Sequence, residues 1–477
     1  MKAPFSPWLL GIRDGLMRLI ALLEHDYPYV SALATDSVGL AVSISQHAKA
    51  VRNATMTTER GVVLRVWKDG LYSEYALNEF DPAAAEAVCA QIKTALDAQL
   101  ALLRETGAEV YDTPALDDEP LTLFVEKEAE LLPEATDVKS LVEKLTAVSD
   151  RGMTLDPRTI ECFVSAQSTH ICKLFLSKHR DLSQSYVYSE GVVGAVVMED
   201  GRNQMDYASV SGLCGPELFD ALDEKLDKAA AGAVELLSAE RIEPGEYEII
   251  TSPEVTGLIA HEAFGHGVEM DMFVKNRALG KDYIDKRVGS ELCSMHEGAL
   301  CADNVTSYAF DDEGTLAGDV TEIDRGILKT GICDALAALR LGVKPTGNGK
   351  RQNYAHKVYT RMTNTMFDSG ESTLEEMIAA TKRGFLLEGM ESGMEDPKHW
   401  GIQCIIKKGR EIVDGKLTGR VVAPIILTGY VPDLLGGICM RSHDREVFGS
   451  GGCGKGHKEW VKVADGGPYL KTKARLG

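Results

Sequence analysis

The spacing of apolar residues in the first half of the chain is helical in four segments. Apolar positions recur at three- and four-residue steps near residues 16–23, 88–103 and 218–237, and a shorter segment of this kind covers residues 137–148. This period places apolar side chains on one face of a helix. The pattern therefore predicts amphipathic helices that pack on a core.

Strand-like segments lie between these helices. Residues 61–67 and 71–75 are rich in β-branched and aromatic side chains and flank the turn signal Lys68-Asp69-Gly70, which predicts a β-hairpin. Alternating segments between residues 159 and 210 predict a meander of further strands. The acidic, proline-bearing interval 106–133 is expected to be an exposed connection.

The pattern changes after a Pro-Gly break at residues 244–245. Beyond it come short β-rich runs separated by glycines, with one further helix expected at the capping box Ser372-Thr373-Leu374-Glu375. We therefore expect an α+β protein with an N-terminal helix-and-sheet domain, residues 1–242, and a β-rich C-terminal domain, residues 243–477. That length is sufficient for two separate cores.

Charge and cysteine usage narrow the class of function. The formal net charge is -21, which argues against direct binding to nucleic acid or to an anionic membrane surface and favours cationic or neutral partners. No apolar run is long enough to span a bilayer. Ten cysteines are scattered without C-x-x-C pairs, which is typical of reduced thiols and predicts a cytoplasmic protein.

One short run, residues 257–271, concentrates residues that carry chemistry. It contains His261, Glu262 and His266 in the pattern H-E-x-x-x-H, with several glycines. Two neutral imidazoles can bind a divalent metal, and a neighbouring carboxylate can act as the base for a metal-activated water. The alternative is a buried helix that carries two hydrogen-bonded histidines.

The five-residue spacing of the two histidines restricts the helix that carries them. Ser252-Pro253-Glu254 provides an N-cap, a first-turn proline and a first-turn acid, so the helix is expected to begin at Pro253. Residues five apart on a regular α-helix point roughly 140° away from each other. Either the helix ends near Gly265, or it contains a π-type widening that aligns both rings.

A catalytic zinc site normally has three protein ligands, so a third must come from elsewhere. Cys453 is favoured because the glycines around it let the backbone bring its sulfur to another element. His457, Cys439, His443 and His356 remain alternatives. Residues 449–456 also approach the G-x-x-x-x-G-K spacing of a phosphate-binding loop, but glycine replaces the Ser or Thr that follows the lysine. A nucleotide-dependent enzyme is thus a weaker alternative.

Two polar runs, residues 345–356 and 361–365, are rich in hydrogen-bond donors. They either line a cleft that binds a peptide backbone or stabilises an oxyanion, or they form solvated loops. The candidate substrate-binding residues in these runs are Asn348, Arg351, His356 and Asn364.

Several motifs together resemble the TldD/PmbA family. In chain order they are residues 261–267 with Glu269, residues 291–293, residues 311–315, residues 345–349, residues 361–365 and residues 453–455. The likeness is to the TldD-type, metal-bearing subunit and covers the C-terminal half, while the first fifty or so residues do not match.

The resemblance implies a zinc metallopeptidase. The positions of His261, His266 and Cys453 would bind Zn²⁺, and that of Glu262 would activate water. Family members are homodimers, or heterodimers with a PmbA-type subunit, that admit unfolded peptides and trim peptide precursors. The alternative is a non-catalytic peptide-binding subunit of such a dimer, in which a fourth protein ligand saturates the metal.

Overall fold

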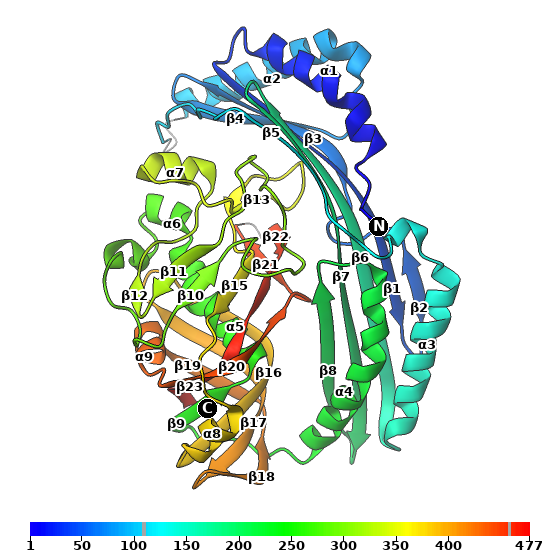
Figure 1. Ribbon diagram of the computed structural model, residues 1–477, viewed down its shortest axis with the longest axis vertical. Helices are drawn as coiled ribbons and strands as arrows, with labels where there is room; N and C mark the ends of the chain where they lie inside the picture. Colours follow the sequence, from blue (N-terminus) through cyan, green and yellow to red (C-terminus); the bar gives the residue numbers. More distant parts are fainter. Residues whose placement is uncertain (107–110, 457–458) are drawn as a thin grey trace.

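The computed structural model describes residues 1–106, 111–456 and 459–477. In this part of the chain, the strands form an eight-stranded sheet from the first half and an eleven-stranded sheet from the second half, with helices packed on both (Figure 1). This arrangement confirms the predicted α+β architecture and the strand-rich second half.

The first sheet is antiparallel except where its edge strand β5 pairs with β7. Its main strands in spatial order are β4 (Leu71–Leu77), β3 (Arg60–Lys68), β1 (Tyr29–Ile44), β6 (Thr159–Ser177), β7 (Arg180–Glu199) and β5 (Leu121–Glu126), with β2 (Lys49–Arg52) on β1 and β8 (Arg202–Gly212) on β7. The predicted hairpin is β3 and β4, and the predicted meander is β6 to β8.

Four helices cover one face of this sheet: α1 (Pro7–Leu23), α2 (Ala85–Glu105), α3 (Val138–Leu155) and α4 (Leu222–Leu237). Every second residue of a strand faces the helices, because successive side chains of a strand point to opposite faces of the sheet. On β1, Ala32 packs under α1 and α2, and Val42 packs under α3 and α4. None of the described helices combines the length and apolar character needed to cross a bilayer.

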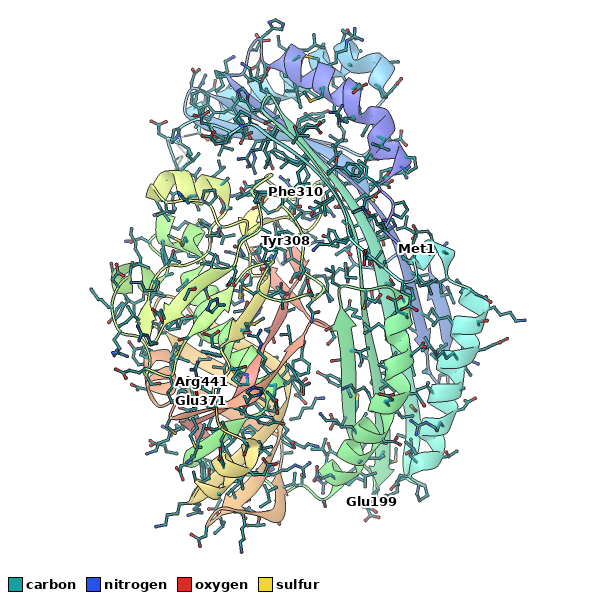
Figure 2. The ribbon with its side chains drawn as sticks, viewed as in Figure 1. Met1, Glu199, Tyr308, Phe310, Glu371 and Arg441 are labelled. Carbon is teal, nitrogen blue, oxygen red and sulfur yellow. The ribbon has the colours of Figure 1, made fainter. Side chains whose placement is uncertain are left out.

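The opposite face of the sheet meets the second half of the chain. Leu33, Val63 and Phe175 pack against Phe310, and Tyr308 packs in a neighbouring cluster with Ile171 of β6. Figure 2 shows Tyr308 and Phe310 at this junction. The Gln184 side chain also donates a hydrogen bond to the Phe310 carbonyl at 2.8 Å, so both apolar and polar contacts join the two halves.

Part of the second sheet is a closed ring of strands, in which each strand pairs with the next. In spatial order its strands are β12 (Ile327–Leu328), β11 (Val320–Asp324), β10 (Met295–Glu297), β15 (Asn364–Phe367), β23 (Ala464–Leu476), β19 (Ile425–Tyr430), β17 (Gly401–Val413), β16 (Arg383–Asp396) and β9 (Gly245–Thr251), with β18 (Lys416–Val422) on β17 and β20 (Met440–Phe448) on β23. Because β9 also pairs with β23, the path from β23 to β9 closes on itself. Helix α5 (Pro253–Ala260) follows β9 directly and packs on β23 and β16.

Short elements complete the second half. They are α6 (Met270–Val274), α7 (Ala335–Leu341), α8 (Leu374–Ala379), α9 (Val431–Gly436), the pair β13 (Gly349–Lys350) with β14 (Tyr359–Thr360), and the pair β21 (Gly452–Lys455) with β22 (Glu459–Lys462). The capping box of α8 joins Thr373 to Glu376, one residue later than expected.

Three strands of the first sheet, β1, β2 and β5, were not expected. Strand β1 is buried along most of both faces, so it lacks the alternation that marks a half-buried strand. Strand β5 lies within the interval 106–133, for which an exposed connection was expected; residues 107–110 of that interval are outside the described residues. Its pairing with β7 corrects that expectation.

Candidate metal centre

The helix that carries the two histidines begins at the predicted residue, and of the two courses left open by the sequence it takes the π-type widening. The Ser252 side chain accepts a hydrogen bond from the Val255 amide, and Pro253 is the first helical residue. After Ala260 the chain continues as a π-helical turn, His261–Gly265, in which the His266 amide donates to the His261 carbonyl. A bond between residues five apart confirms the π-type widening, and it turns both rings toward one side.

Glycines let this helix approach its neighbours closely. A Cβ atom on Gly265 would overlap the sulfur of Met362, and one on Gly257 would lie 2.5 Å from a carboxylate oxygen of Asp465. Larger residues at these positions would push the helix away from β15 and β23. The glycines therefore fix the depth at which the histidines lie.

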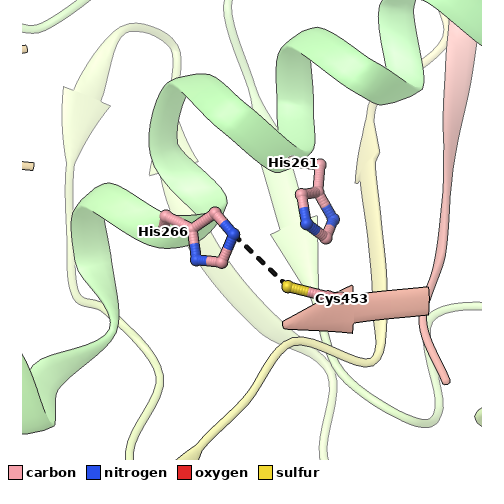
Figure 3. Close-up of side chains that lie close together, drawn as sticks. All are labelled: His261, His266 and Cys453. Carbon is pink, nitrogen blue, oxygen red and sulfur yellow. Dashed lines mark hydrogen bonds between the residues drawn. The ribbon is translucent and has the colours of Figure 1, made fainter. Parts of the chain in front are cut away.

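The structure brings His261, His266 and Cys453 together (Figure 3). One potential ligand atom from each residue lies within 4.8 Å of the other two. The Cys453 sulfur is 3.3 Å from Nε2 of His266, and the two rings are nearly perpendicular, with centroids 5.0 Å apart. Cys453 reaches this position on β21, which pairs with β22.

The three side chains are electrostatically coupled. Burial opposes the thiolate of Cys453, but the charges of His261 and His266 and their hydrogen bonds to the sulfur outweigh burial and lower the pKa of Cys453 to about 4. Burial likewise opposes the imidazolium of His266, while Glu269 and Cys453 raise its pKa well above the ordinary value. A thiolate beside two imidazoles is a donor set that binds divalent zinc.

A layer of charged residues supports His266. Glu269, which follows it by three residues, lies 3.0 Å from Nδ1 of His266. Lys455 lies 3.1 Å from the same carboxylate and 2.8 Å from Asp271. The contact with Glu269 leaves Nε2 of His266 directed at Cys453, as in metal sites where a carboxylate orients the ligand histidine.

The contacts of Lys455 argue against the alternative of a phosphate-binding loop. The Lys455 ammonium donates to Asp271 and to the carbonyl of Thr360 at 3.0 Å, besides its ion pair with Glu269. Its three N–H groups are therefore used within the chain. This lysine supports the histidine helix rather than a phosphate.

Glu262 lies on the wall of a cleft of about 850 Å³ that also exposes His261, His266 and Cys453. Strand β16 forms the facing wall, and a Cβ atom on its Gly393 would lie 2.5 Å from Cγ of Glu262. The Glu262 side chain thus lines the same open cleft as the three potential ligands.

The predicted substrate-binding residues lie elsewhere, in positions that favour a structural role. Asn348 and Asn364 are fully buried; Asn348 donates to Glu297 and to the Arg361 carbonyl, and Asn364 donates to the carbonyl of Gly298. Arg351 pairs with Glu74 and donates to the carbonyl of His356. None of the four is among the described residues that line the cleft.

The alternative third ligands are not brought to the histidines within the described residues. The group of potential ligand atoms around His261 contains His266 and Cys453, and it does not include Cys439, His443 or His356. His457 lies outside the described residues.

Sequence reasoning missed three residues of the cleft region. Asp465 lies 3.7 Å from Nδ1 of His261, and burial raises the pKa of Asp465 to about 7. Glu395 and Trp400 lie on and just beyond β16, near Gly267. No motif marks these positions, because strands distant in sequence bring them to the helix.

Comparisons with known proteins find similar sequences and a similar fold. Residues 244–471 match the family model described as the PmbA/TldA metallopeptidase C-terminal domain. A metalloprotease of Methanocaldococcus jannaschii is 31% identical over 284 residues, which is 60% of this chain and 62% of that protein. A zinc metalloprotease TldD homolog of Saccharolobus solfataricus is 31% identical over 297 residues, 61% of this chain and 63% of the relative. The aligned part thus spans a little over three fifths of these curated relatives.

Solved structures share the fold over nearly the whole chain. A protein of Thermotoga maritima described as a modulator of a DNA gyrase superposes with a TM-score of 0.78 at 18% identity, covering 98% of this chain and 100% of the other. TldE from Thermococcus kodakarensis gives 0.76 at 16% identity, covering 97% and 100%. At such identities the likeness establishes the fold alone, and the sequence matches establish the relationship. Residues 244–471 therefore form a C-terminal domain of the PmbA/TldD metallopeptidase type.

Proposed function

We propose that this protein is a zinc-dependent peptidase that cleaves unfolded peptides or peptide precursors. The observation that carries the proposal is the convergence of His261, His266 and Cys453 beside Glu262 at the wall of an open cleft. The relatives named metalloprotease, one of them a zinc metalloprotease, support the same reaction class.

The donor set fits a zinc ion. Tetrahedral coordination at ordinary zinc–sulfur and zinc–nitrogen bond lengths separates ligand atoms by roughly 3.3–3.6 Å. The Cys453 sulfur and Nε2 of His266 are 3.3 Å apart, and the remaining separations, up to 4.8 Å, need only small side-chain rotations. Bound there, zinc would supply Lewis acidity that polarises a peptide carbonyl and acidifies water.

The protein's own residues would divide the remaining work. The Glu262 carboxylate accepts a proton from the attacking water and delivers it to the departing amine. Glu269 fixes the ring of His266 through Nδ1, and Asp465 lies on the corresponding side of His261. Strand β16 excludes bulk water from one side of Glu262 through the close contact at Gly393.

The cleft is suited to an extended peptide. Strand β9 pairs with β16 only over residues 384–387, so within the described residues no strand covers that edge of β16 beyond residue 388. The uncovered part continues along the cleft beside Gly393. A free strand edge can pair with the backbone of an unfolded segment, whereas a folded substrate would not enter.

We further propose a dimer, either of two copies of this chain or with a PmbA-type subunit, in the cytoplasm. The structural likeness to TldE supports such a partner. All ten cysteines lie in the described residues and are free thiols, which suits a reducing compartment. Light scattering of the purified protein, alone and mixed with a PmbA-type subunit, tests the assembly.

The peptidase proposal is tested by zinc analysis and peptide cleavage. We expect one zinc per chain in the wild type and in Glu262→Gln, and a loss of about 10²–10⁴ in kcat for Glu262→Gln because the base is removed. Glu254→Gln, which changes a carboxylate at the start of the same helix, is the matched control and should retain activity.

The non-catalytic alternative gives a different result. A zinc-loaded chain that cleaves no peptide, alone or with its partner subunit, would contradict the peptidase proposal. Cleavage by Glu262→Gln at the wild-type rate would exclude Glu262 as the base.

A further inference from the structure

The wall of the cleft contributed by β16 carries a carboxyl group that the proposed mechanism does not use. Alternate side chains of a strand share a face, so Gly393 and Glu395 both point toward the histidine helix. Gly393 lies against Glu262, and a Cβ atom on Gly267 would lie 3.0 Å from Oε1 of Glu395. Glu395 is therefore placed beside the turn that carries His266.

The Glu395 carboxyl has no partner within the described residues. Both of its oxygens are buried without a hydrogen bond, and the Trp400 indole N–H nearby is also unpartnered. Burial raises the pKa of Glu395 to about 9, with Glu262 adding to the rise and His266 opposing it. A buried carboxyl left unbonded is costly, so a donor from a ligand would be strongly favoured.

The two lysines that line the cleft are engaged elsewhere, and the exposed Arg277, which also lines it, makes no hydrogen bond to Glu395. Lys455 pairs with Glu269 and Asp271, and Lys275 pairs with Asp271 at 3.3 Å. The charges of Glu262, Glu269 and Asp396 raise the pKa of Glu395, and the charge of His266 lowers it. The surroundings of Glu395 are thus negative, and a cationic group would be the stabilising occupant.

We propose that Glu395 is a specificity-determining residue that binds an ammonium group of the peptide close to the scissile bond. The inference rests on the proposed peptidase function. Residues two apart on a strand are separated by roughly 6.6 Å, so Glu395 is about two residues along an extended substrate from the point where Gly393 meets Glu262. The ammonium comes either from the free amino terminus or from a lysine side chain.

Binding to the zinc-loaded Glu262→Gln variant tests this without cleavage. Four peptides of one parent sequence serve as probes, with a free or acetylated amino terminus and with lysine or norleucine near the cleavage point. When the Glu395→Gln substitution is added, fluorescence anisotropy should show at least about tenfold weaker binding of the peptides that carry the recognised ammonium group. Peptides lacking the recognised ammonium should bind equally to both proteins.

The acetylated and norleucine series separate the two sources of the cation. Glu375→Gln, an exposed position on α8 outside the cleft, controls for the change in net charge and should leave all affinities unchanged. Glu395→Asp, which retains the carboxyl group on a shorter side chain, should keep part of the preference and gives a second variant if Glu395→Gln folds poorly.

Equal weakening of all four peptides by Glu395→Gln would overturn the proposal, because it would indicate a general structural role. No weakening of any peptide would overturn it as well. If the wild type binds zinc but cleaves nothing, the peptidase proposal fails, while a charge-dependent binding preference would still support Glu395 as the selecting residue.

Discussion

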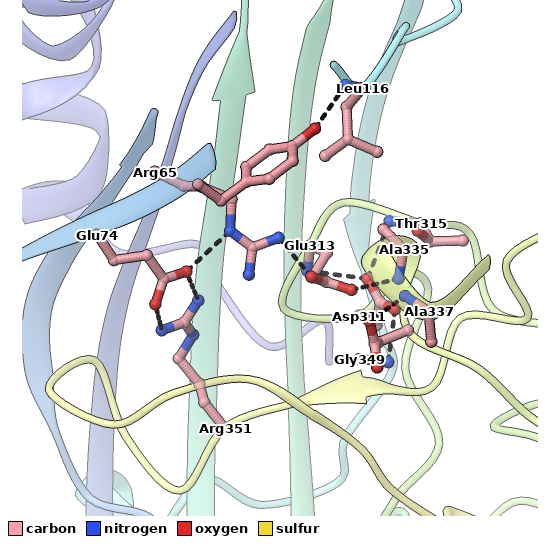
Figure 4. A network of polar contacts seen from close by, with 12 residues as sticks. Arg65, Glu74, Leu116, Asp311, Glu313, Thr315, Ala335, Ala337, Gly349 and Arg351 are labelled. Carbon is pink, nitrogen blue, oxygen red and sulfur yellow. Dashed lines mark hydrogen bonds and ion pairs between the residues drawn. The ribbon is translucent and has the colours of Figure 1, made fainter. Parts of the chain in front are cut away.

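Two buried polar clusters of this protein differ in how completely their groups are bonded. In the first, Arg65 of the N-terminal sheet bridges Glu74 and Glu313, and Glu74 also binds Arg351 (Figure 4). Asp311 accepts hydrogen bonds from backbone amides, including that of Gly349 at 2.8 Å. Apart from Nε of Arg351, the charged groups of this cluster have partners, and together they join the two halves of the chain.

In the second cluster, at the cleft, several buried polar groups have no hydrogen-bond partner among the residues that the structure describes. Both oxygens of Glu395, Nε1 of Trp400, Nδ1 of His261 and Oδ1 of Asp465 are buried and lack partners in the described part of the chain. Because buried polar groups in proteins are nearly always bonded, the contrast separates two roles. Bonded charges stabilise the arrangement of the halves, and the unbonded Glu395 carboxyl in the cleft wall is available to a substrate.

The largest effect is expected from removing the thiol at the cleft. Cys453→Ala should lose zinc and lower peptidase activity by at least about a thousandfold, since a catalytic zinc needs three protein ligands. Zinc content and kcat/KM measure this. Cys439→Ser, at an exposed cysteine, is the control, and equal zinc in both variants would contradict Cys453 as a ligand.

The next effect tests the bonded cluster. Arg65→Ala should lower the free energy of unfolding by about 3 kcal/mol, because it leaves the buried Glu313 without its ion partner. The midpoint of urea unfolding reports the change. Arg104→Ala removes a pair with Asp69 whose side chains are 49% and 70% exposed, and it should cost less than about 1 kcal/mol. Similar midpoint shifts for both would refute the distinction.

The sequence predicted the parts of this contrast that depend on local pattern. The cap at Ser252 and the five-residue spacing of His261 and His266 fix the start and widening of the helix within a few turns. Cys453 is 187 residues from His266, so no local pattern determines its approach. Only the flanking glycines and the family resemblance indicated it.

The polar run around Asn348 shows why a density of donors in the sequence does not by itself locate a binding site. Asn348 donates to the buried Glu297, which also accepts from the amide and hydroxyl of Thr363, whereas Arg351 of the same run binds Glu74. A sequence reveals that donors are abundant but not which acceptor they meet. Glu395 was missed for the converse reason, since its lack of a partner is visible only in three dimensions.

A histidine in the first sheet extends the comparison to pH. Burial lowers the pKa of His170, but its hydrogen bonds and charge interactions with Cys172 and Glu134 outweigh burial and raise the pKa to about 9. Protonated His170 therefore stabilises the folded state by roughly 2 kcal/mol. This contribution is complete below about pH 6.5, the pKa of histidine in the unfolded chain, and is lost as pH rises toward 9. Urea unfolding at pH 6 and pH 9 should show this loss in the wild type. His170→Gln should reduce it, and an unchanged slope would rule out His170 as its source.

The smallest effect has the opposite sign and tests the unbonded cluster. Glu395→Met replaces a carboxyl without partners by an apolar side chain of similar length, so the free energy of unfolding should rise by about 1 kcal/mol. Glu313→Met, at a carboxylate that binds Arg65 and the Ala335 amide, should lower it. Because both variants remove one buried carboxyl, the sign of the change in urea midpoint measures the bonding state directly. A loss of stability in Glu395→Met as large as that in Glu313→Met would mean that Glu395 has a structural partner, and the division between the two clusters would fail.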